Sequence, residues 1–210
     1  MKQRRLTRAE KSAQTRAQLM ASARQLFLRR GFHAASLELV AEEAGFTIGA
    51  VYSRFGSKAD LFLAILDEHI DRLVAGVAQV ATDDQPLGAH AELLAGRRMA
   101  LLERETEWFP LVLEFWSHAA RDERLRREFA ARHERLVGAY AGLIEADYAR
   151  LGLPLPLAPE VLARAVVAMG NGVALERLAD PGRVPEELLS TMALAFLRGV
   201  AADGPAERRS

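Results

Sequence analysis

The sequence predicts an all-α fold of about nine helices, and three observations support that fold class. Apolar residues recur at helical spacing, as Leu19, Ala23 and Leu26 do near the N-terminus. Glycine, proline and capping residues separate one such stretch from the next. None of the 210 residues belongs to the alternating apolar and polar pattern that indicates a half-buried strand.

Composition narrows the class of protein. The chain has no cysteine, which excludes a disulfide framework and a thiolate metal site. It has no run of 18 apolar residues, and its basic N-terminus lacks the apolar segment of a signal peptide. We therefore expect a cytoplasmic protein, and the spacing of the five histidines predicts neither a metal site nor a cofactor.

Charge is distributed unevenly, although the net charge is zero. Residues 1–58 contain 11 Lys or Arg and 4 Asp or Glu, a balance of +7, whereas residues 59–210 contain 17 and 24, a balance of −7. A basic module that meets a polyanion, joined to an acidic module, accounts for this division. A basic N-terminal tail without a binding role is the alternative, but it does not explain Arg54 and Lys58.

The first two helices of the basic part are marked by glycines and a cap. The first covers about residues 9–30 and stops at Gly31. The second begins after the N-cap Ser36, and Gly45 ends it. A tight turn then leads to the next helix, so the pair forms a helix-turn-helix motif backed by the first helix.

The third helix, at residues 48–55, is the short helix on which the basic part is centred. Thr47 caps its start, and Gly56 is expected to end it in a left-handed conformation. Val51 and Phe55 share the face that must be buried. The opposite face is small and polar with one long cation, which suits insertion into the major groove of DNA.

A set of residue types at fixed spacing runs through this part and into the following helix. Its members are Gly31-Phe32, Ser36-Leu37, Val40-Ala41, Ala44-Gly45, Thr47, Gly49-Ala50-Val51-Tyr52, Phe55, Ser57-Lys58 and Leu61. This combination, within about residues 15–70, resembles the tetracycline-repressor (TetR) family of bacterial transcription regulators. The resemblance implies an N-terminal helix-turn-helix DNA-binding domain and a C-terminal helical domain for ligand binding and dimerisation.

The resemblance also implies which residues lie at the DNA. We predict DNA contacts for Ser36, Thr47, Ile48, Gly49, Ala50, Tyr52, Ser53, Arg54 and Lys58. Thr47, Tyr52 and Lys58 would mainly hold phosphates, whereas the outward residues of the short helix would read bases. Two alternatives stay open: Tyr52 packs under the motif, and Arg54 binds either guanine or a phosphate.

Six more helices are expected in the remainder of the chain. Their approximate ranges are 57–80, 90–106, 109–121, 122–151, 159–178 and 185–200, and the tail from residue 202 is expected to be disordered. The helix at 109–121 is apolar nearly all round, which indicates a buried helix. We predict a DNA-binding domain at 1–57, a bridging helix at 58–80 as the only connection, and a ligand-binding and dimerisation domain at 81–210.

The last two expected helices each have two apolar faces, one more than a monomer needs. A second copy of the chain across a two-fold axis would cover the surplus, and burial in the chain's own core is the alternative. The resemblance, in which these helices form the four-helix bundle of a dimer, favours a homodimer. The predicted interface consists of Val166, Val173, Leu188, Met192 and Phe196.

Aromatic residues and isolated polar groups gather between residues 90 and 178. In TetR-type proteins this region encloses a pocket for a small-molecule effector, and such walls suit an apolar or aromatic organic compound. The predicted pocket residues are Trp108, Phe109, Leu113, Trp116, His118, Met169 and Asn171. Packing in the core is the alternative for each of them.

The sequence contains one acid–base pair at helical spacing, Glu114 and His118, and a structural ion pair accounts for it. We therefore expect no enzymatic activity. The sequence predicts a dimeric repressor that binds a palindromic operator in double-stranded DNA and is released by a small-molecule effector. A helical adaptor that binds only protein is the alternative, and it leaves the basic face unexplained.

Overall fold

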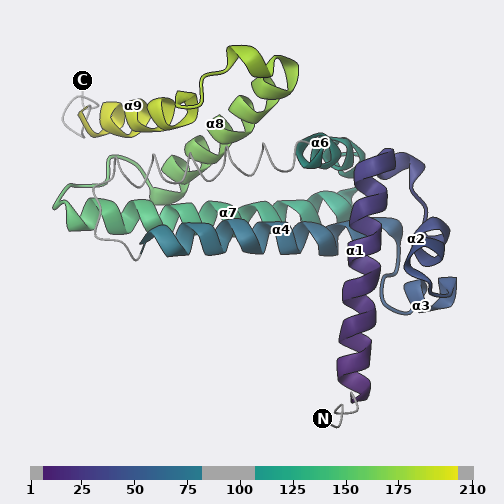
Figure 1. Cartoon of the computed structure of the whole chain (residues 1–210). Helices are drawn as coiled ribbons and strands as arrows, with labels where there is room; N and C mark the ends of the chain where they lie inside the picture. Colours follow the sequence, from purple (N-terminus) through teal and green to yellow (C-terminus); the bar gives the residue numbers. More distant parts are fainter. Residues whose placement is uncertain (1–6, 82–106, 203–210) are drawn as a thin grey trace, which may run out of the picture. The chain divides into compact units, whose positions relative to one another are not determined.

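The computed structural model of the chain describes residues 7–81 and 107–202 (Figure 1). Over these residues the chain forms eight α-helices and one short 3-10 helix, and they contain no strand, as the all-α prediction requires. The predicted helix at 90–106 and the tail beyond residue 202 lie outside the described residues. No described helix is long and apolar enough to cross a membrane.

The chain divides into two compact units. Unit 1 comprises residues 1–69 and 111–129, and unit 2 comprises residues 70–110 and 130–210. Three helices continue from one unit into the other: α4 (Lys58–Ala81), α6 (Trp108–Ala119) and α7 (Glu123–Arg150). The expectation that one bridging helix is the only connection was therefore wrong, because α6 and α7 were assigned wholly to the C-terminal part.

In unit 1, α1 (Arg8–Ala34) begins with a capping box and bends near its end. The side chain of Thr7 accepts a hydrogen bond from the Glu10 amide, and the Glu10 carboxylate accepts one from the Thr7 amide. Gly31 has φ 76° and ψ 169°, so regular helix stops there as predicted. One further helical turn, residues 32–34, then follows, which the sequence did not indicate.

The helix-turn-helix pair consists of α2 (Leu37–Ala44) and α3 (Ile48–Tyr52). The Ser36 hydroxyl accepts a hydrogen bond from the Leu39 amide at 3.3 Å, and Gly45 ends α2 with φ 71°, so both predicted ends of α2 are confirmed. α3 is shorter than predicted. Gly56 does not have the positive φ expected of it, and the cap at the end of α3 is Ser53.

Side chains explain the early end of α3. The Ser53 hydroxyl and the Arg54 guanidinium both donate to the Ala50 carbonyl, at 3.0 Å each. The Arg54 amide donates to the Val51 carbonyl instead of the Ala50 carbonyl. Side-chain donors thus replace the backbone donor that would have continued the helix.

Four aromatic rings form the centre of unit 1. Phe27 and Phe32 on α1, Phe62 on α4 and Phe115 on α6 are at most 2% exposed. The Phe62 and Phe115 rings are stacked with centroids 4.2 Å apart, and the Phe32 and Phe115 rings meet edge to face at 5.0 Å. The first turn of α6 belongs to unit 2, and the rest of the helix belongs to unit 1. Through Phe115, α6 contributes to the aromatic core on which the helix-turn-helix pair is built.

The start of α4 is fixed by polar contacts in unit 1. The Ser57 hydroxyl donates to the Asp60 carboxylate at 2.7 Å and accepts from the Asp60 amide at 3.1 Å. Arg124, at the start of α7, donates to the same carboxylate at 2.8 Å. Burial acts to raise the pKa of Asp60, but the hydrogen bonds from Ser57 and Arg124 outweigh it, and the pKa lies below the ordinary value.

α6 is amphipathic and not buried all round as the sequence indicated. Trp108, Leu111, Phe115 and Ala119 form its buried stripe, whereas Trp116 is 56% exposed. These positions are three or four residues apart, the spacing of one helical face. The expectation was wrong because the number of apolar residues on a helix does not show how much of its surface neighbouring helices cover.

Unit 2 contains the remaining helices, α8 (Pro159–Ala179), the 3-10 helix η1 (Pro181–Arg183) and α9 (Leu188–Ala202). Val173 of α8 and Leu189 of α9 are buried against each other. The C-terminal part of α4 packs on α7 through Val77, Val80 and Leu143.

Candidate nucleic-acid interface

α3 is held in place by its N-cap and by the apolar side chains on its buried face. The Thr47 hydroxyl accepts a hydrogen bond from the Ala50 amide at 3.3 Å, and Val51 and Phe55 are 0% and 3% exposed. The guanidinium of Arg16 on α1 lies 5.2 Å from the centroid of the Phe55 ring. A five-residue helix is too short to be stable alone, so these contacts fix its position on α1 and α2.

The opposite side of α3 faces solvent. The exposed residues there are Thr47, Ile48, Gly49, Tyr52 and Ser53, and Ala50 is half-buried. Tyr52 is 54% exposed, so its ring does not pack under the motif, and Ile48 is 37% exposed. This face offers hydroxyl groups suited to phosphates and apolar groups suited to the methyl group of thymine.

Arg54 is half-buried and folded back on α3. Its Nη1 donates to the Ala50 carbonyl at 3.0 Å and to the Ser53 hydroxyl at 3.1 Å. Its buried Nε has no hydrogen-bond partner among the described residues. A contact with a base or a phosphate through Nη1 would therefore compete with these two hydrogen bonds.

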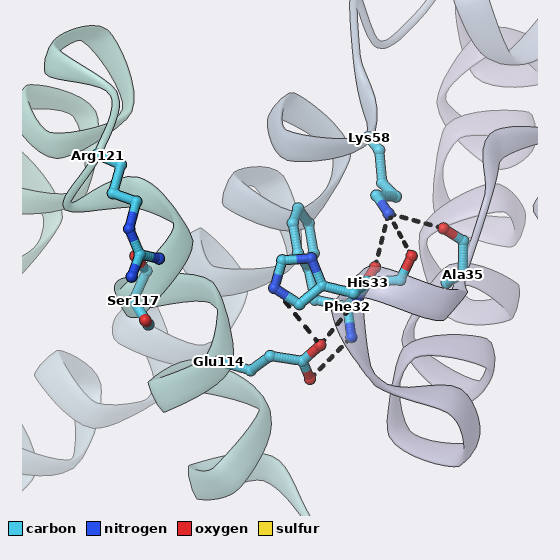
Figure 2. A network of polar contacts seen from close by, with 7 residues as sticks. All are labelled: Phe32, His33, Ala35, Lys58, Glu114, Ser117 and Arg121. Atoms are coloured by element: carbon cyan, nitrogen blue, oxygen red, sulfur yellow. Dashed lines mark hydrogen bonds and ion pairs between the residues drawn. The ribbon is translucent and has the colours of Figure 1, made fainter.

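Lys58, the first residue of α4, points toward Phe32, His33 and Ala35 at the end of α1 (Figure 2). Its ammonium group donates to the carbonyls of Phe32, His33 and Ala35 at 2.7, 3.1 and 2.8 Å. It also lies 4.6 Å from the centroid of the Phe32 ring. Burial lowers the pKa of Lys58, and the negative charge of Glu114 opposes that effect.

The contacts of Glu114 were missed from the sequence. Its carboxylate accepts hydrogen bonds from the amides of Phe32 and His33 at 3.0 and 2.8 Å, and lies 4.0 Å from the His33 ring nitrogen Nε2 (Figure 2). The expected ion pair with His118 was therefore wrong. The His118 ring packs against the rings of Phe32 and His33, with centroids 5.1 and 5.6 Å apart. The one available signal was a carboxylate on an apolar helix.

The predicted pocket residues belong to both units. Leu113, Trp116 and His118 are in unit 1, and Trp108, Phe109, Met169 and Asn171 are in unit 2. Trp108 is buried, Trp116 and Asn171 are exposed, and the others are half-buried. The pocket stays a prediction. Among the described residues, no group of three or more His, Cys, Asp or Glu side chains is placed to hold a metal ion.

The predicted dimer residues lie on α8 and α9. Val173 is 3% exposed and buried between these two helices of one chain, whereas Met192 is 37% exposed. Val166, Leu188 and Phe196 are half-buried. Val161, Leu175 and Leu178 on α8 add apolar side chains that are 53%, 51% and 49% exposed.

Comparison with known protein families gives two matches. Residues 19–65, which include α2 and α3, match the family described as bacterial regulatory proteins, tetR family. Residues 89–202, more than half of the chain, match the BetI-type transcriptional repressor C-terminal family. The chain belongs to the TetR family. Members of this family are transcriptional regulators.

Curated relatives align over different shares of the chain. The chain is 36% identical over 103 residues to the transcriptional activator FasR of Mycolicibacterium smegmatis, covering 47% of this chain and 45% of FasR. It is 39% identical over 88 residues to the regulator TtgR of Pseudomonas putida, covering 40% and 41% of the two chains. The chain thus matches less than half the length of these relatives. The BetI regulator of Vibrio campbellii is 24% identical over 178 residues, 81% of this chain and 83% of BetI.

Solved structures share the fold. GusR of Salmonella enterica superposes with a TM-score of 0.75 at 21% identity and covers 93% of this chain and 100% of its own. A transcriptional regulator of Pseudomonas aeruginosa PAO1 superposes with a TM-score of 0.76 at 18% identity and covers 94% of each chain.

Proposed function

We propose that this TetR-family protein is a homodimeric repressor that binds a palindromic operator and releases it when a small organic effector binds. The observation that carries the proposal is that α3 exposes one face to solvent while its opposite face is buried. The proposed DNA contacts are Ser36, Thr47, Ile48, Gly49, Ala50, Tyr52, Ser53 and Arg54. The match of residues 89–202 to a repressor-type C-terminal family supports repression, and a DNA-bound regulator would act in the cytoplasm.

DNA binding is tested by selecting duplexes from a random pool with the purified protein and measuring affinity by fluorescence anisotropy at several salt concentrations. The selected site should be an imperfect palindrome, because the two α3 helices of a dimer reach successive major-groove faces about 34–36 Å apart. Affinity should fall steeply as salt rises, because cations of the protein displace counter-ions from phosphates. Binding that does not depend on salt, or no binding at all, would contradict the proposal and favour a protein adaptor.

Arg54 is the residue proposed to read a base. Arg54→Ala should weaken operator binding by roughly 1–3 kcal/mol and relax the preference at one base pair of each half-site. Arg54→Lys is the matched variant, because lysine keeps the charge but not the planar pair of donors that binds guanine. If Arg54→Ala weakens binding to all sequences equally and Arg54→Lys restores the affinity, Arg54 holds a phosphate instead.

The homodimer is proposed from the surplus apolar surface of α8 and α9. In the single chain, Val161, Leu175, Leu178 and Met192 are between 37% and 53% exposed. Exposed apolar side chains on adjacent helices are typical of a surface that a second subunit covers.

The effector is proposed to be an apolar or aromatic compound that binds among the predicted pocket residues. Such a compound should raise the melting temperature, because a ligand that binds only the folded state stabilises it. By linkage it should also lower operator affinity by the same factor by which the operator lowers effector affinity. A thermal-shift screen against apolar metabolites and drugs, followed by operator release with each hit, tests both. A tightly bound compound that leaves operator affinity unchanged would contradict this mechanism.

A further inference from the structure

The turn between α1 and α2 is held from two sides by charged groups of opposite sign. Residues 32–35 follow the break at Gly31, so the Phe32 and His33 amides start a new helical turn, and the first amides of a helix need acceptors from outside it. The Glu114 carboxylate accepts both amides at 3.0 and 2.8 Å (Figure 2). At the other end of the turn, the Lys58 ammonium binds three carbonyls at 2.7 to 3.1 Å.

The signs of these charges match the ends of the turn. Backbone amides carry partial positive charge and attract an anion, whereas free carbonyls attract a cation. An ammonium group has three hydrogens to donate, and three carbonyls accept them here. The turn is therefore clamped at both ends, and we call Glu114, Lys58 and residues 32–35 the α1–α2 clamp.

Gly31 makes room for the carboxylate. A Cβ atom at Gly31 would lie 2.8 Å from Oε2 of Glu114, closer than real Cβ contacts, and 3.3 Å from Oε1, which is a tight contact. The φ of 76° with ψ of 169° belongs to a region that only glycine occupies readily. The bent backbone and the carboxylate thus fit each other.

The α1–α2 clamp joins the two ends of the helix-turn-helix motif. Residues 32–35 lie directly before Ser36, the cap of α2, and Lys58 starts α4 soon after α3 ends. We propose that Glu114 is a positioning residue for DNA binding: from α6 it fixes the turn that sets where α2 begins, and through Lys58 it fixes the start of α4. This inference rests on the proposed function. Glu114 itself need not touch DNA.

The test compares three variants in DNA binding to the selected duplex. Glu114→Gln keeps the shape but presents an amide donor to one of the two backbone amides, and Glu114→Asp keeps the charge but shortens the reach. Glu123→Gln on α7 is the control, because it removes the same charge from an exposed carboxylate that pairs only with Arg127 among the contacts described. Removal of a carboxylate that does not position the motif should leave the affinity for DNA unchanged or raise it, because DNA is an anion.

Both Glu114 variants should weaken binding by roughly 2- to 30-fold, the range for residues that act on a binding site without touching the ligand. The control should bind as tightly as the wild type or more tightly. Circular dichroism at the assay temperature checks that each variant is folded. If Glu114→Gln does not fold, the comparison uses Glu114→Asp alone. Equal or tighter binding by a folded Glu114→Asp variant would overturn the inference.

Hydrogen exchange supplies a readout that needs no DNA. In the wild type the Phe32 and His33 amides should be protected, and in both Glu114 variants they should exchange faster while amides in α8 stay unchanged. A uniform increase over the chain would indicate global destabilisation and overturn the positioning role. If the wild type does not bind DNA, the proposed function fails; if the wild type binds and the Glu114 variants bind equally, only this inference fails.

Discussion

Lys58 illustrates how a basic residue beside a DNA-binding helix can bind backbone carbonyls of its own chain instead of a DNA phosphate. All three hydrogens of its ammonium group are engaged by carbonyls of Phe32, His33 and Ala35. This arrangement accounts for a cation at the start of α4, where the helix dipole by itself favours an anion. The TetR resemblance instead predicts a phosphate contact, and the salt dependence of binding distinguishes the two roles.

We expect Lys58→Met to weaken DNA binding while the slope of log affinity against log salt stays unchanged. A residue that holds a phosphate contributes about 0.9 to that slope, so its removal flattens the slope by about one. The measurement is anisotropy between low and physiological salt. Arg126→Met, which removes an exposed cation on α7, controls for the loss of one charge. A slope flattened by about one in Lys58→Met alone would assign Lys58 to a phosphate.

At the scale of one helix, Gly31 is the position where a methyl group should be most costly. Gly31→Ala should lower the free energy of unfolding by about 1–3 kcal/mol from backbone strain alone, with a further loss from the contact with Glu114. Gly45→Ala is the comparison, since Gly45 also has a positive φ of 71°, although in the less strained left-handed helical region, and an added Cβ would meet nothing within 4 Å. Urea unfolding of both variants measures the difference. An equal loss at both glycines would contradict the close approach of Glu114 to Gly31.

The start of α4 should be sensitive to acid. The pKa of Asp60 lies below its ordinary value in the folded protein, so the group stabilises the fold above the pKa of the unfolded chain. That contribution is lost as pH falls through the lower, folded-state pKa. Asp60→Asn should therefore cost about 1 kcal/mol near neutral pH, since exposed ion pairs are weak and a cap contributes a similar amount. The difference from wild type should shrink below about pH 4.

A double-mutant cycle of Asp60→Asn with Arg124→Gln separates the ion pair from the Ser57 contact. The two losses in unfolding free energy should add to more than the loss in the double variant. Strict additivity at neutral pH would show that the Asp60–Arg124 ion pair contributes nothing to the stability of the α4 start.

At the scale of helices, most signals that the sequence provided act over four residues or fewer. Ser36 and Thr47 cap their helices as expected, because a cap needs only an amide two or three residues ahead. The end of α3 was misplaced because Ser53 and Arg54 compete for the Ala50 carbonyl, which no spacing rule indicates. The contacts of Glu114 join residues 81 and 82 positions apart, beyond the reach of any local pattern.

For the whole molecule, the proposed dimer makes a direct prediction about association. Met192→Glu should dissociate the homodimer, because it places a charge in the apolar surface that the partner would cover, and should not unfold the chain, because Met192 is 37% exposed. Sedimentation velocity measures the change. Leu153→Glu is the control, at a residue 47% exposed between α7 and α8. A monomeric wild type, or a dimer unaffected by Met192→Glu, would contradict the proposed interface.

The break at Gly31 and its carboxylate partner bear on how this regulator can be recombined with others. The DNA-binding surface is encoded near the N-terminus, yet unit 1 also requires residues 111–129, which supply Glu114 and Phe115. A chimera that joins residues 1–81 of this chain to a foreign C-terminal domain would lack the Glu114 carboxylate, which accepts hydrogen bonds from two backbone amides. It would also lack the Phe115 ring of the core. Exchange of DNA specificity between relatives should therefore succeed by grafting α3 alone, or by transferring residues 1–69 together with 111–129.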